Sequence, residues 1–307
     1  MNKILVTAKI NPDLDGTSCT LAYSDLLKQF GKDADGLITG SPQSEVKFFI
    51  EKRHIQIPTR SDEVSNEWNQ IILVDASSTK GMPKTVKAAK VIELIDHRPG
   101  EPEKEFPQAK IQNELVGAAA TLIVEKFIQA NKKPQIDHAK LLYGAIYHNS
   151  LNFIATNTSQ RDKDAAKYLE TNYGFSEEII REMFNYATHE IENDIKKALK
   201  DDAKEIGNDM KIGAYQIIVW GREVVTNSKS IIESSVNELT TELGLKWSFV
   251  NVIELESKQS HIFTHPKGEE ILSKALNSKF KNNWSTLPAI LRKQIIPKVT
   301  SYISSQN

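Results

Sequence analysis

The sequence predicts an α/β protein with two domains: a parallel-sheet domain followed by a smaller α/β domain at the C-terminus. The chain has 307 residues, which is more than one hydrophobic core usually organises. In its first half, short apolar runs alternate with helical patterns, which is typical of parallel strands buried on both faces. We place the domains at residues 1–188 and 189–307, and we expect the active site in the cleft between them.

The elements of the first domain follow from this alternation of patterns. Apolar runs predict strands over residues 4–8, 36–39, 70–75 and 91–96, separated by helices over 17–31, 44–52 and 83–89. After an extended stretch the chain becomes helical, and we expect helices over 117–130, 137–150, 159–171 and 176–199. Ser159 is a suitable N-cap for the third of these.

The second domain repeats the βα pattern over a shorter length. Strands are expected over 211–220 and 247–253, on either side of a helix over 229–243, and a further strand over 261–264. No Gly or Pro within 190–200 marks where this domain begins.

Charge and cysteine content narrow the class of function. With 39 basic and 40 acidic residues the net charge is -1, so no basic field over the whole chain favours nucleic acid. The single cysteine, Cys19, excludes an internal disulfide and a cysteine-based zinc site. The apolar run at Met1 to Ala8 is too short for a signal peptide, and no run is long enough to cross a bilayer. We therefore expect a cytoplasmic protein with no membrane partner.

Three of the predicted strands end in acidic or histidine residues. Asp13 and Asp15 follow the first strand, Asp75 closes the strand over 70–75, and the motif Asp96-His97-Arg98 closes the strand over 91–96. Ligands of open α/β sheets bind outside the carboxyl ends of the strands, so these groups should converge. Carboxylates and a histidine that converge are suited to hold divalent metal.

Each of these strand ends also has an ordinary structural explanation. Asp13 and Asp15 fit an acidic turn that caps the helix at Gly16, and Asp75, which precedes Ala76, fits a turn or a helix N-cap. What favours a metal or phosphate site is that three such ends occur in order and are separated by helices.

The order of these motifs along the chain is Asp-x-Asp at residues 13–15, then Asp75 after a strand, then Asp96-His97-Arg98. This order resembles that of the DHH phosphoesterases, a superfamily that includes the manganese-dependent (family II) inorganic pyrophosphatases, the exopolyphosphatases and the Prune proteins. Asp96-His97-Arg98-Pro99 is most similar to the Prune group, as is the stretch over 113–121. Asp202-Ala203-Lys204-Glu205 resembles the segment that supplies a phosphate-binding lysine in the family, and the stretch over 291–297 resembles its basic C-terminal motif. The resemblance implies a DHH domain followed by a DHHA2-like, substrate-binding domain.

The sequence departs from the family's pattern at three positions in the first domain. Lys9 stands where pyrophosphatases place a metal-binding His, and a protonated amine cannot ligate metal but can contact phosphate. Asn149 stands where the family places a metal-binding Asp, and His148 beside it is either a substitute ligand or an ordinary helix-face residue. Arg98 replaces the second His of the DHH motif, and it can clamp phosphate but cannot act as a general acid.

The resemblance implies a metal-dependent phosphohydrolase that acts on a phosphoanhydride such as short-chain polyphosphate or pyrophosphate. Asp13, Asp15, Asp75 and His97 are expected to hold Mn²⁺ or Mg²⁺, with Co²⁺ as a substitute. The cations expected to neutralise the substrate are Arg98, Lys204, Arg292 and Lys293, with Lys9, Asn149 and His148 as further substrate contacts.

A second hypothesis is a weakly active or inactive regulatory protein that binds phosphate or nucleotide on a degenerate DHH fold. It follows from the poorer ligand set left by Lys9 and Asn149. Both hypotheses predict a small phosphorylated ligand and no nucleic-acid partner, and both are compatible with a homodimer.

Overall fold

The computed structural model describes residues 3–206 and 210–306, in two compact units. Unit 1 is Met1–Met183 and unit 2 is Phe184–Asn307. Helix α6 (Glu177–Asn193) contains both this division and the boundary after residue 188 that we expect from the sequence. Met1 and Asn2, where the N-terminal apolar run begins, lie outside the described residues. Across the described ranges no helix combines the length and apolar character needed to span a membrane.

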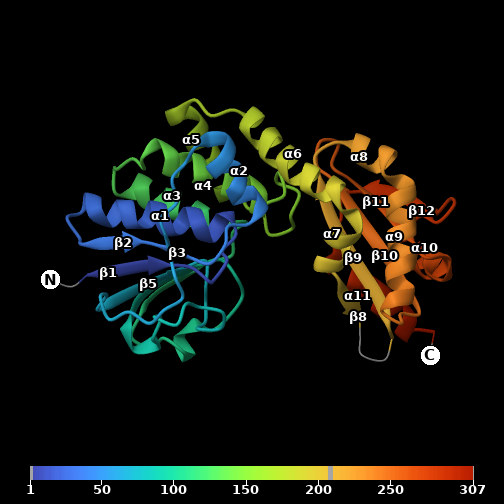
Figure 1. The fold of residues 1–307 in the computed structure, drawn as a ribbon, viewed down its shortest axis with the longest axis horizontal. Helices are drawn as coiled ribbons and strands as arrows, with labels where there is room; N and C mark the ends of the chain where they lie inside the picture. Colours follow the sequence, from blue (N-terminus) through green and yellow to red (C-terminus); the bar gives the residue numbers. More distant parts are fainter. Residues whose placement is uncertain (1–2, 207–209, 307) are drawn as a thin grey trace. The chain divides into compact units, whose positions relative to one another are not determined.

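Unit 1 is built on a five-stranded sheet in the order β2-β1-β5-β6-β7, in which every pairing is parallel. Its strands are β1 (Ile4–Thr7), β2 (Ala34–Gly36), β5 (Gln70–Val74), β6 (Val91–Asp96) and β7 (Lys110–Asn113). The strands β1, β5 and β6, whose ends carry the acidic motifs, are neighbours at the centre of the sheet. Figure 1 labels two of them, β1 and β5. The predicted parallel sheet is confirmed.

Helices cover one face of this sheet. They are α1 (Leu14–Gln29), α2 (Ser44–Arg53), α3 (Ala119–Gln129), α4 (Ile136–Asn149) and α5 (Gln160–Tyr173). Of these, α1 contacts β1, β2 and β5, and α3 contacts β6. On the other face, Ile71, Leu73 and Leu94 pack with side chains of non-helical segments, including Met82 and Phe106. The strands β5 and β6 therefore lie between two packed layers.

Three of the predicted elements are wrong in detail. The helix expected over 83–89 is an irregular segment that ends in the short 3₁₀ helix η1 (Ala88–Lys90). There the Thr85 hydroxyl donates to the Glu63 carbonyl at 2.9 Å and accepts from the Ser65 N–H at 2.9 Å, which joins this segment to the loop before β5.

The strand expected over 36–39 is divided, since β3 (Ile38–Thr39) leaves the main sheet and pairs with β4 (Thr59–Arg60). The single helix expected over 176–199 is divided into α6 and α7 (Ile195–Asp201). Asp194 makes the break, because its carboxylate accepts from the Lys197 N–H and so begins a new helix.

Unit 2 is a second α/β layer structure with a mixed five-stranded sheet. In the order β12-β11-β10-β9-β8, only the central β9–β10 pair is parallel. The strands are β8 (Lys204–Ile206), β9 (Ile212–Val219), β10 (Trp247–Glu254), β11 (Gln259–Thr264) and β12 (Trp284–Pro288). The expected strands over 211–220, 247–253 and 261–264 correspond to β9, β10 and β11.

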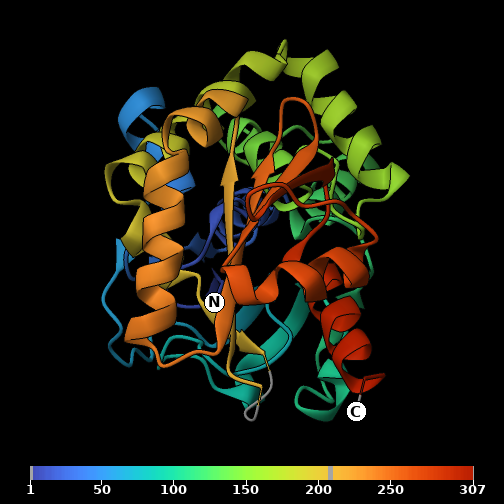
Figure 2. The ribbon, with the colours of Figure 1, turned by 90° about the vertical axis from the view of Figure 1, so that its right-hand side faces the viewer.

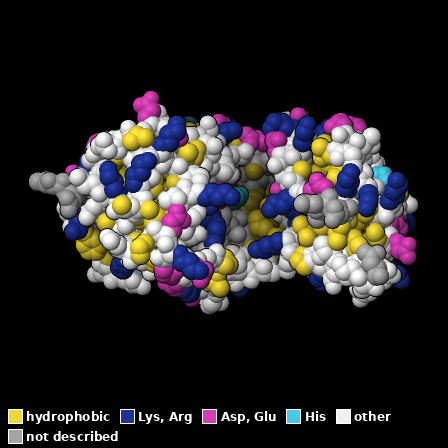
Figure 3. All heavy atoms as spheres, turned by 90° about the horizontal axis from the view of Figure 1, so that it is seen from below, with side chains coloured by type: hydrophobic (Ala, Val, Ile, Leu, Met, Phe, Trp, Pro, Cys, Tyr) yellow, Lys and Arg dark blue, Asp and Glu magenta, His cyan; other side chains and the backbone are white. Residues whose placement is uncertain are grey.

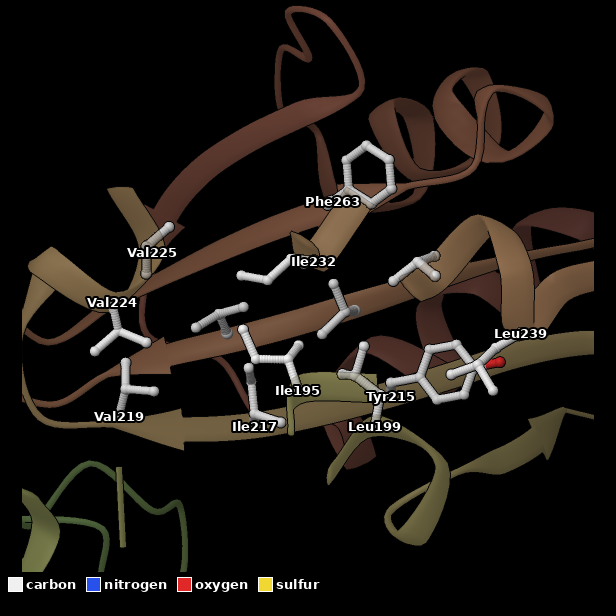
Figure 4. Close-up of a cluster of buried hydrophobic side chains, with 13 residues drawn as sticks. Ile195, Leu199, Tyr215, Ile217, Val219, Val224, Val225, Ile232, Leu239 and Phe263 are labelled. Atoms are coloured by element: carbon white, nitrogen blue, oxygen red, sulfur yellow. The ribbon is translucent and has the colours of Figure 1, made fainter. Parts of the chain in front are cut away.

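Helices lie on both faces of the sheet of unit 2 (Figure 2). One face packs against α7, α8 (Arg222–Asn227) and α9 (Lys229–Glu242), with Tyr215 and Phe263 among the buried side chains (Figure 4). The opposite face packs against α10 (Glu269–Leu276) and α11 (Arg292–Ser304). The predicted α/β class of the second domain is confirmed.

The surface agrees with the balanced charge of the sequence. On the face drawn in Figure 3, Lys and Arg side chains occur on both units among acidic and uncharged ones. A partner that binds through charge of one sign over the whole surface is therefore not expected, and a charged ligand would need a local binding site.

Candidate metal centre

The ends of three neighbouring strands bring Asp15, Asp75 and His97 together. One ligand atom of each lies within 4.8 Å of the others, and all three side chains are buried. Asp15 lies in the first turn of α1, which follows β1, while Asp75 directly follows β5 and His97 directly follows β6. Parallel strand order therefore accounts for the meeting of residues that are up to 82 positions apart.

Asp15 is fully buried and is held by donors from two other helices. Its carboxylate oxygens accept hydrogen bonds from the N–H groups of Ala119 and Ala120, each at 2.8 Å. These are the first two residues of α3, whose N-terminal N–H groups have no partner within their own helix. The Asn149 amide, at the end of α4, donates to Asp15 Oδ2 at 2.6 Å. Asp15 therefore has a fixed orientation before any ligand binds.

His97 is oriented by the backbone of the segment before α3. Its Nδ1 lies 3.0 Å from the Val116 carbonyl oxygen, which can only accept, so we assign the proton to Nδ1. Nε2 is buried without a hydrogen-bond partner and lies 3.6 Å from Asp15 Oδ2 and 3.5 Å from Asp75 Oδ1. This is the arrangement of a metal-binding histidine, in which the second nitrogen is fixed by a backbone acceptor.

Asp75 is held by Arg98 as well as by its own backbone. Arg98 Nη2 lies 2.6 Å from Asp75 Oδ1, and Nη1 donates to the Asp75 carbonyl oxygen at 2.7 Å. The Asp75 N–H donates to the Ile95 carbonyl at 2.9 Å. Asp75 has a left-handed φ of 50°, which Asp tolerates better than most residues. Arg98 thus places a fixed positive charge on one carboxylate of the cluster.

The cluster shifts the pKa values of its members. Burial, followed by the negative charge of Asp75, raises the pKa of Asp15 to about 7. Burial also raises the pKa of Asp75, although His97 and Arg98 partly oppose it. For His97, burial alone would lower the pKa, but Asp75 and Asp15 outweigh it and raise it to about 9. Three groups in one buried site therefore have perturbed pKa values, which is a feature of functional sites.

The donor set fits a divalent cation. Two carboxylates and an imidazole are ligands that suit Mn²⁺, and the first-row metals bind such sites readily. The observation that decides the fit is His97 Nε2, which is buried beside the two carboxylates without a hydrogen-bond partner. Since the raised pKa of His97 keeps a proton on Nε2 near pH 7, a bound cation would have to displace that proton. Among the described residues, no other group of three or more acidic, His or Cys side chains meets the same criterion.

The sequence comparisons agree with this geometry. The DHH family, N-terminal domain, matches residues 3–146, which include the ligand cluster and most of α4. Residues 3–146 form a DHH family domain.

Curated relatives match the chain over nearly its full length. A "probable manganese-dependent inorganic pyrophosphatase" of Exiguobacterium sp. is 26% identical over 307 residues, covering 98% of both chains. A protein of the same name from Bacillus licheniformis is 25% identical over 304 residues, again covering 98% of both. The similarity therefore extends beyond the DHH domain into unit 2.

Solved structures share the fold. A structure assigned to a family II inorganic pyrophosphatase of Methanococcus jannaschii has a TM-score of 0.62 at 24% identity, covering 98% of this chain and 99% of that one. An exopolyphosphatase-related protein from Bacteroides fragilis has a TM-score of 0.53 at 14% identity, covering 99% and 92%. At these identities the likeness concerns the fold alone.

The other residues predicted for the site of the DHH domain have different positions. Asp13 is the N-cap of α1 and accepts from the Gly16 N–H at 3.0 Å, as its ordinary structural explanation requires. It does not belong to the three-residue ligand group. Lys9 is half-buried beyond the end of β1, and His148 is half-buried on α4, next to Asn149. The metal role of Asp13 and the substrate roles of Lys9 and His148 stay predictions.

An unusual turn fixes the end of α4, which carries Asn149. Leu151, Asn152 and Phe153 all have left-handed φ values, between 50° and 64°. Such a conformation costs roughly 1–2 kcal/mol for each residue other than glycine. The Ser150 hydroxyl compensates in part by accepting from the Phe153 N–H at 3.2 Å. Backbone strain of this kind persists where the surrounding structure requires it, here beside the ligand cluster.

In unit 2 the three predicted cations have different surroundings. Lys204, on β8, and Lys293, in the first turn of α11, are exposed. Arg292 is buried and ion-paired with Asp202, and its Nη1 also donates to the Ala214 carbonyl at 3.2 Å. The charge of Arg292 is therefore balanced within unit 2, whereas the two lysines carry exposed positive charge.

Sequence reasoning missed the backbone groups that orient the ligands. The Val116 carbonyl and the Ala119 and Ala120 N–H groups all belong to one short segment. Backbone groups have no residue identity, so only the resemblance of residues 113–121 to the Prune group marked this segment.

Proposed function

We propose that this chain is a metal-dependent phosphohydrolase whose substrate is a phosphoanhydride, either pyrophosphate or short-chain polyphosphate. The observation that carries the proposal is the buried cluster of Asp15, Asp75 and His97, with the unpartnered Nε2 of His97 directed at two carboxylates. The names of the curated relatives support the substrate class and manganese as the metal.

Asp15, Asp75 and His97 would hold the cation, with Mn²⁺ as the ion that the names of the curated relatives indicate and Mg²⁺ or Co²⁺ as substitutes. A divalent cation bound there supplies Lewis acidity, which lowers the pKa of water and polarises a phosphoryl oxygen. The protein's own contribution is orientation. The donors from α3 and α4 hold Asp15, the Val116 carbonyl holds His97, and Arg98 holds Asp75.

Arg98 is the group of unit 1 best suited to contact the substrate. Its side chain is 36% exposed, so part of the guanidinium reaches solvent while two of its nitrogens contact Asp75. A guanidinium presents donors in a fixed fork that matches phosphate oxygens. We propose that Arg98 stabilises negative charge on phosphate, and that Lys9 adds a second positive charge at the end of β1.

In unit 2 we propose phosphate binding for Lys204 and Lys293, both exposed. Arg292 is better suited to a positioning role, because its guanidinium is bonded to Asp202 and to the backbone. Asp202 precedes Lys204 by two residues, and Arg292 directly precedes Lys293. The Arg292–Asp202 pair therefore fixes the two segments from which both lysines project.

The test is phosphate release from pyrophosphate and tripolyphosphate with Mn²⁺, Mg²⁺ or Co²⁺ added to the full chain. Asp75→Asn is the informative variant, because Asn keeps the shape and tolerates the left-handed φ of this position while removing the charge. We expect activity to fall more than about 100-fold, since even the outer partners of a metal site cost about 10–100-fold.

Asp137→Ala, which removes an exposed carboxylate on α4, is the matched control and should retain full activity. If no cation supports turnover by the unaltered chain, the enzyme proposal fails. It also fails if Asp75→Asn is as active as the unaltered chain.

One observation favours the second hypothesis, a regulatory protein that binds phosphate or nucleotide. Arg98 occupies one oxygen of Asp75, and the Asn149 amide occupies one oxygen of Asp15, so both ligand carboxylates are already engaged by the protein. Saturable binding of pyrophosphate or nucleotide, combined with no turnover under any metal, would favour this hypothesis over the enzyme.

We also propose where the protein is located and how it assembles. A cytoplasmic location suits a chain with a single buried cysteine and no disulfide. The homodimer stays a prediction, to be checked by the mass of the chain in solution.

A further inference from the structure

A second buried carboxylate lies next to the metal centre but outside its ligand group. Asp162, at the start of α5, is fully buried. Its oxygens accept from the Gly117 N–H at 2.9 and 3.0 Å and from the Thr121 hydroxyl at 2.6 Å. They also accept from the N–H and the hydroxyl of Ser159, each at 2.7 Å. In the described part of the chain, Asp162 has no ion pair, so these neutral donors alone satisfy the carboxylate.

Half of this arrangement is an ordinary helix start. Ser159 and Asp162 form a capping box, in which the side chain three residues into the helix bonds back to the N-cap N–H. A capping box involves only the helix that it begins. The bonds to Gly117 and Thr121 come from residues 45 and 41 positions earlier, and they have no role in capping α5.

Gly117 and Thr121 flank the groups that orient the metal ligands. Val116, whose carbonyl accepts from His97 Nδ1, directly precedes Gly117. Ala119 and Ala120, whose N–H groups bind the Asp15 carboxylate, lie between Gly117 and Thr121. The Asp162 carboxylate is therefore bonded near both ends of the segment 116–121, at Gly117 and at Thr121.

Gly117 allows this close approach. A Cβ at this position would lie 3.0 Å from Asp162 Cγ and 3.1 Å from each carboxylate oxygen, which is tighter than ordinary contact. Any larger residue would push the carboxylate away from the segment. The Asn157 amide adds a weaker bond, donating to the Val116 carbonyl at 3.4 Å.

We infer that Asp162 is a positioning residue of the metal centre: it fixes the segment 116–121 so that the Val116 carbonyl and the Ala119 and Ala120 N–H groups hold His97 and Asp15 in place for a divalent cation. The inference rests on the proposed function, whose metal it concerns. Partners of this outer kind typically change metal affinity about 10–100-fold when they are removed.

The test compares Asp162→Asn with Ser159→Ala. Asn has one acceptor oxygen in place of two. Since the Gly117 N–H is bonded to both oxygens of Asp162, the NH₂ group of Asn faces it in either orientation, and in one orientation also faces the Ser159 N–H. Ser159→Ala removes the hydroxyl bond of the cap and leaves the bonds to Gly117 and Thr121. We expect Asp162→Asn to raise the Kd for Mn²⁺ about tenfold or more, and Ser159→Ala to change it less than about twofold.

Glu254→Gln is a matched control in unit 2. Glu254 is also a buried carboxylate bonded by the N–H and hydroxyl of one serine, Ser257, and it belongs to unit 2. This variant should lower the melting temperature and leave the Mn²⁺ affinity unchanged. The inference is overturned if folded Asp162→Asn binds Mn²⁺ like the unaltered chain, or if Ser159→Ala or Glu254→Gln weakens binding equally.

A second measurement does not depend on metal uptake. The His97 Nδ1–H signal in the NMR spectrum of the metal-free protein reports its bond to Val116, and Asp162→Asn should shift or broaden it. An unchanged signal overturns the inference, even where the unaltered chain takes up no Mn²⁺ and the proposed function has failed. If Asp162→Asn does not fold, Gly117→Ala is the substitute and must show the same two effects.

Discussion

The contact between Asn149 and Asp15 leads to a sharp prediction for the variant Asn149→Asp. The Asn149 amide donates to Asp15 Oδ2 at 2.6 Å, so an Asp at this position would set one carboxylate against another. At a separation of roughly 4 Å and an effective dielectric constant near 20, two such charges repel by about 4 kcal/mol. The lost hydrogen bond adds about 1–3 kcal/mol, and sharing a proton between the two carboxylates relieves part of the total.

For the metal-free variant we therefore expect a loss of about 2–4 kcal/mol in the free energy of unfolding. In a unit of this size that corresponds to roughly 5–10 °C in melting temperature. Mn²⁺ should reverse the loss, because the new carboxylate is a further ligand. A tenfold gain in affinity over the unaltered chain would return about 1.4 kcal/mol at saturating metal.

The assay is thermal unfolding with a chelator and with saturating Mn²⁺, together with titration calorimetry for the metal. Asn251→Asp is the matched control, because Asn251 is fully buried in unit 2 and its amide donates to the Ile290 carbonyl at 2.6 Å. That variant should lose stability with or without metal. Our reasoning is refuted if metal-free Asn149→Asp is as stable as the unaltered chain, or if Mn²⁺ stabilises both chains equally.

Three further predictions concern packing and charge. Gly144→Ala, whose Cβ would lie 2.5 Å from Phe49 Cζ, should cost about 1–3 kcal/mol in urea unfolding, and an unaltered midpoint would contradict the packing of α4. Arg161 lowers the pKa of Glu114, so their pair stabilises the fold above the ordinary Glu pKa and loses this effect as the pH falls through the lowered value. Arg161→Met should therefore flatten the fall in stability that acid titration shows below the ordinary Glu pKa. Arg292→Met should destabilise unit 2 by about 1–2 kcal/mol, measured by denaturation, because it removes the Arg292 bonds to the Asp202 carboxylate and the Ala214 carbonyl, while Asp202 keeps the Gln216 N–H and partial access to water.

The strand-end residues of the site were predictable because they follow directly from the sheet. An apolar run that ends in Asp75, or in Asp96 and His97, indicates a buried strand with a polar group at its carboxyl end. Parallel order then brings such ends together, and the structure groups Asp75 and His97 with Asp15. Asp13 and Asp15 are two residues apart, and sequence alone did not distinguish the helix cap from the buried ligand candidate.

The groups that support the ligands were not predictable in the same way. Ser159 was expected as an N-cap, which is a local property, but the bonds from Asp162 to Gly117 depend on how α5 packs against a segment 45 residues earlier. The edge strands β7, β8 and β12 were also missed. Edge strands are short and partly exposed, as the charged start of β8 at Lys204 illustrates, so they lack the apolar run that reveals a central strand.

The altered positions Lys9, Arg98 and Asn149 all change the charge of the centre in the same direction, since each adds a positive charge or removes a negative one relative to the family pattern. Arg98 contacts one oxygen of Asp75 at 2.6 Å, and Asn149 contacts one oxygen of Asp15 at the same distance. The oxygens that lie nearest His97 Nε2 are these same two, Asp75 Oδ1 and Asp15 Oδ2, so a cation bound beside His97 would share them with Arg98 and Asn149. A second divalent cation on Asp75 would lie close to the Arg98 guanidinium, and at roughly 4 Å the two would repel by about 8 kcal/mol at an effective dielectric constant near 20. The charge of Arg98 therefore weakens cation binding at Asp75, most of all for a second cation, which would have to share the same carboxylates.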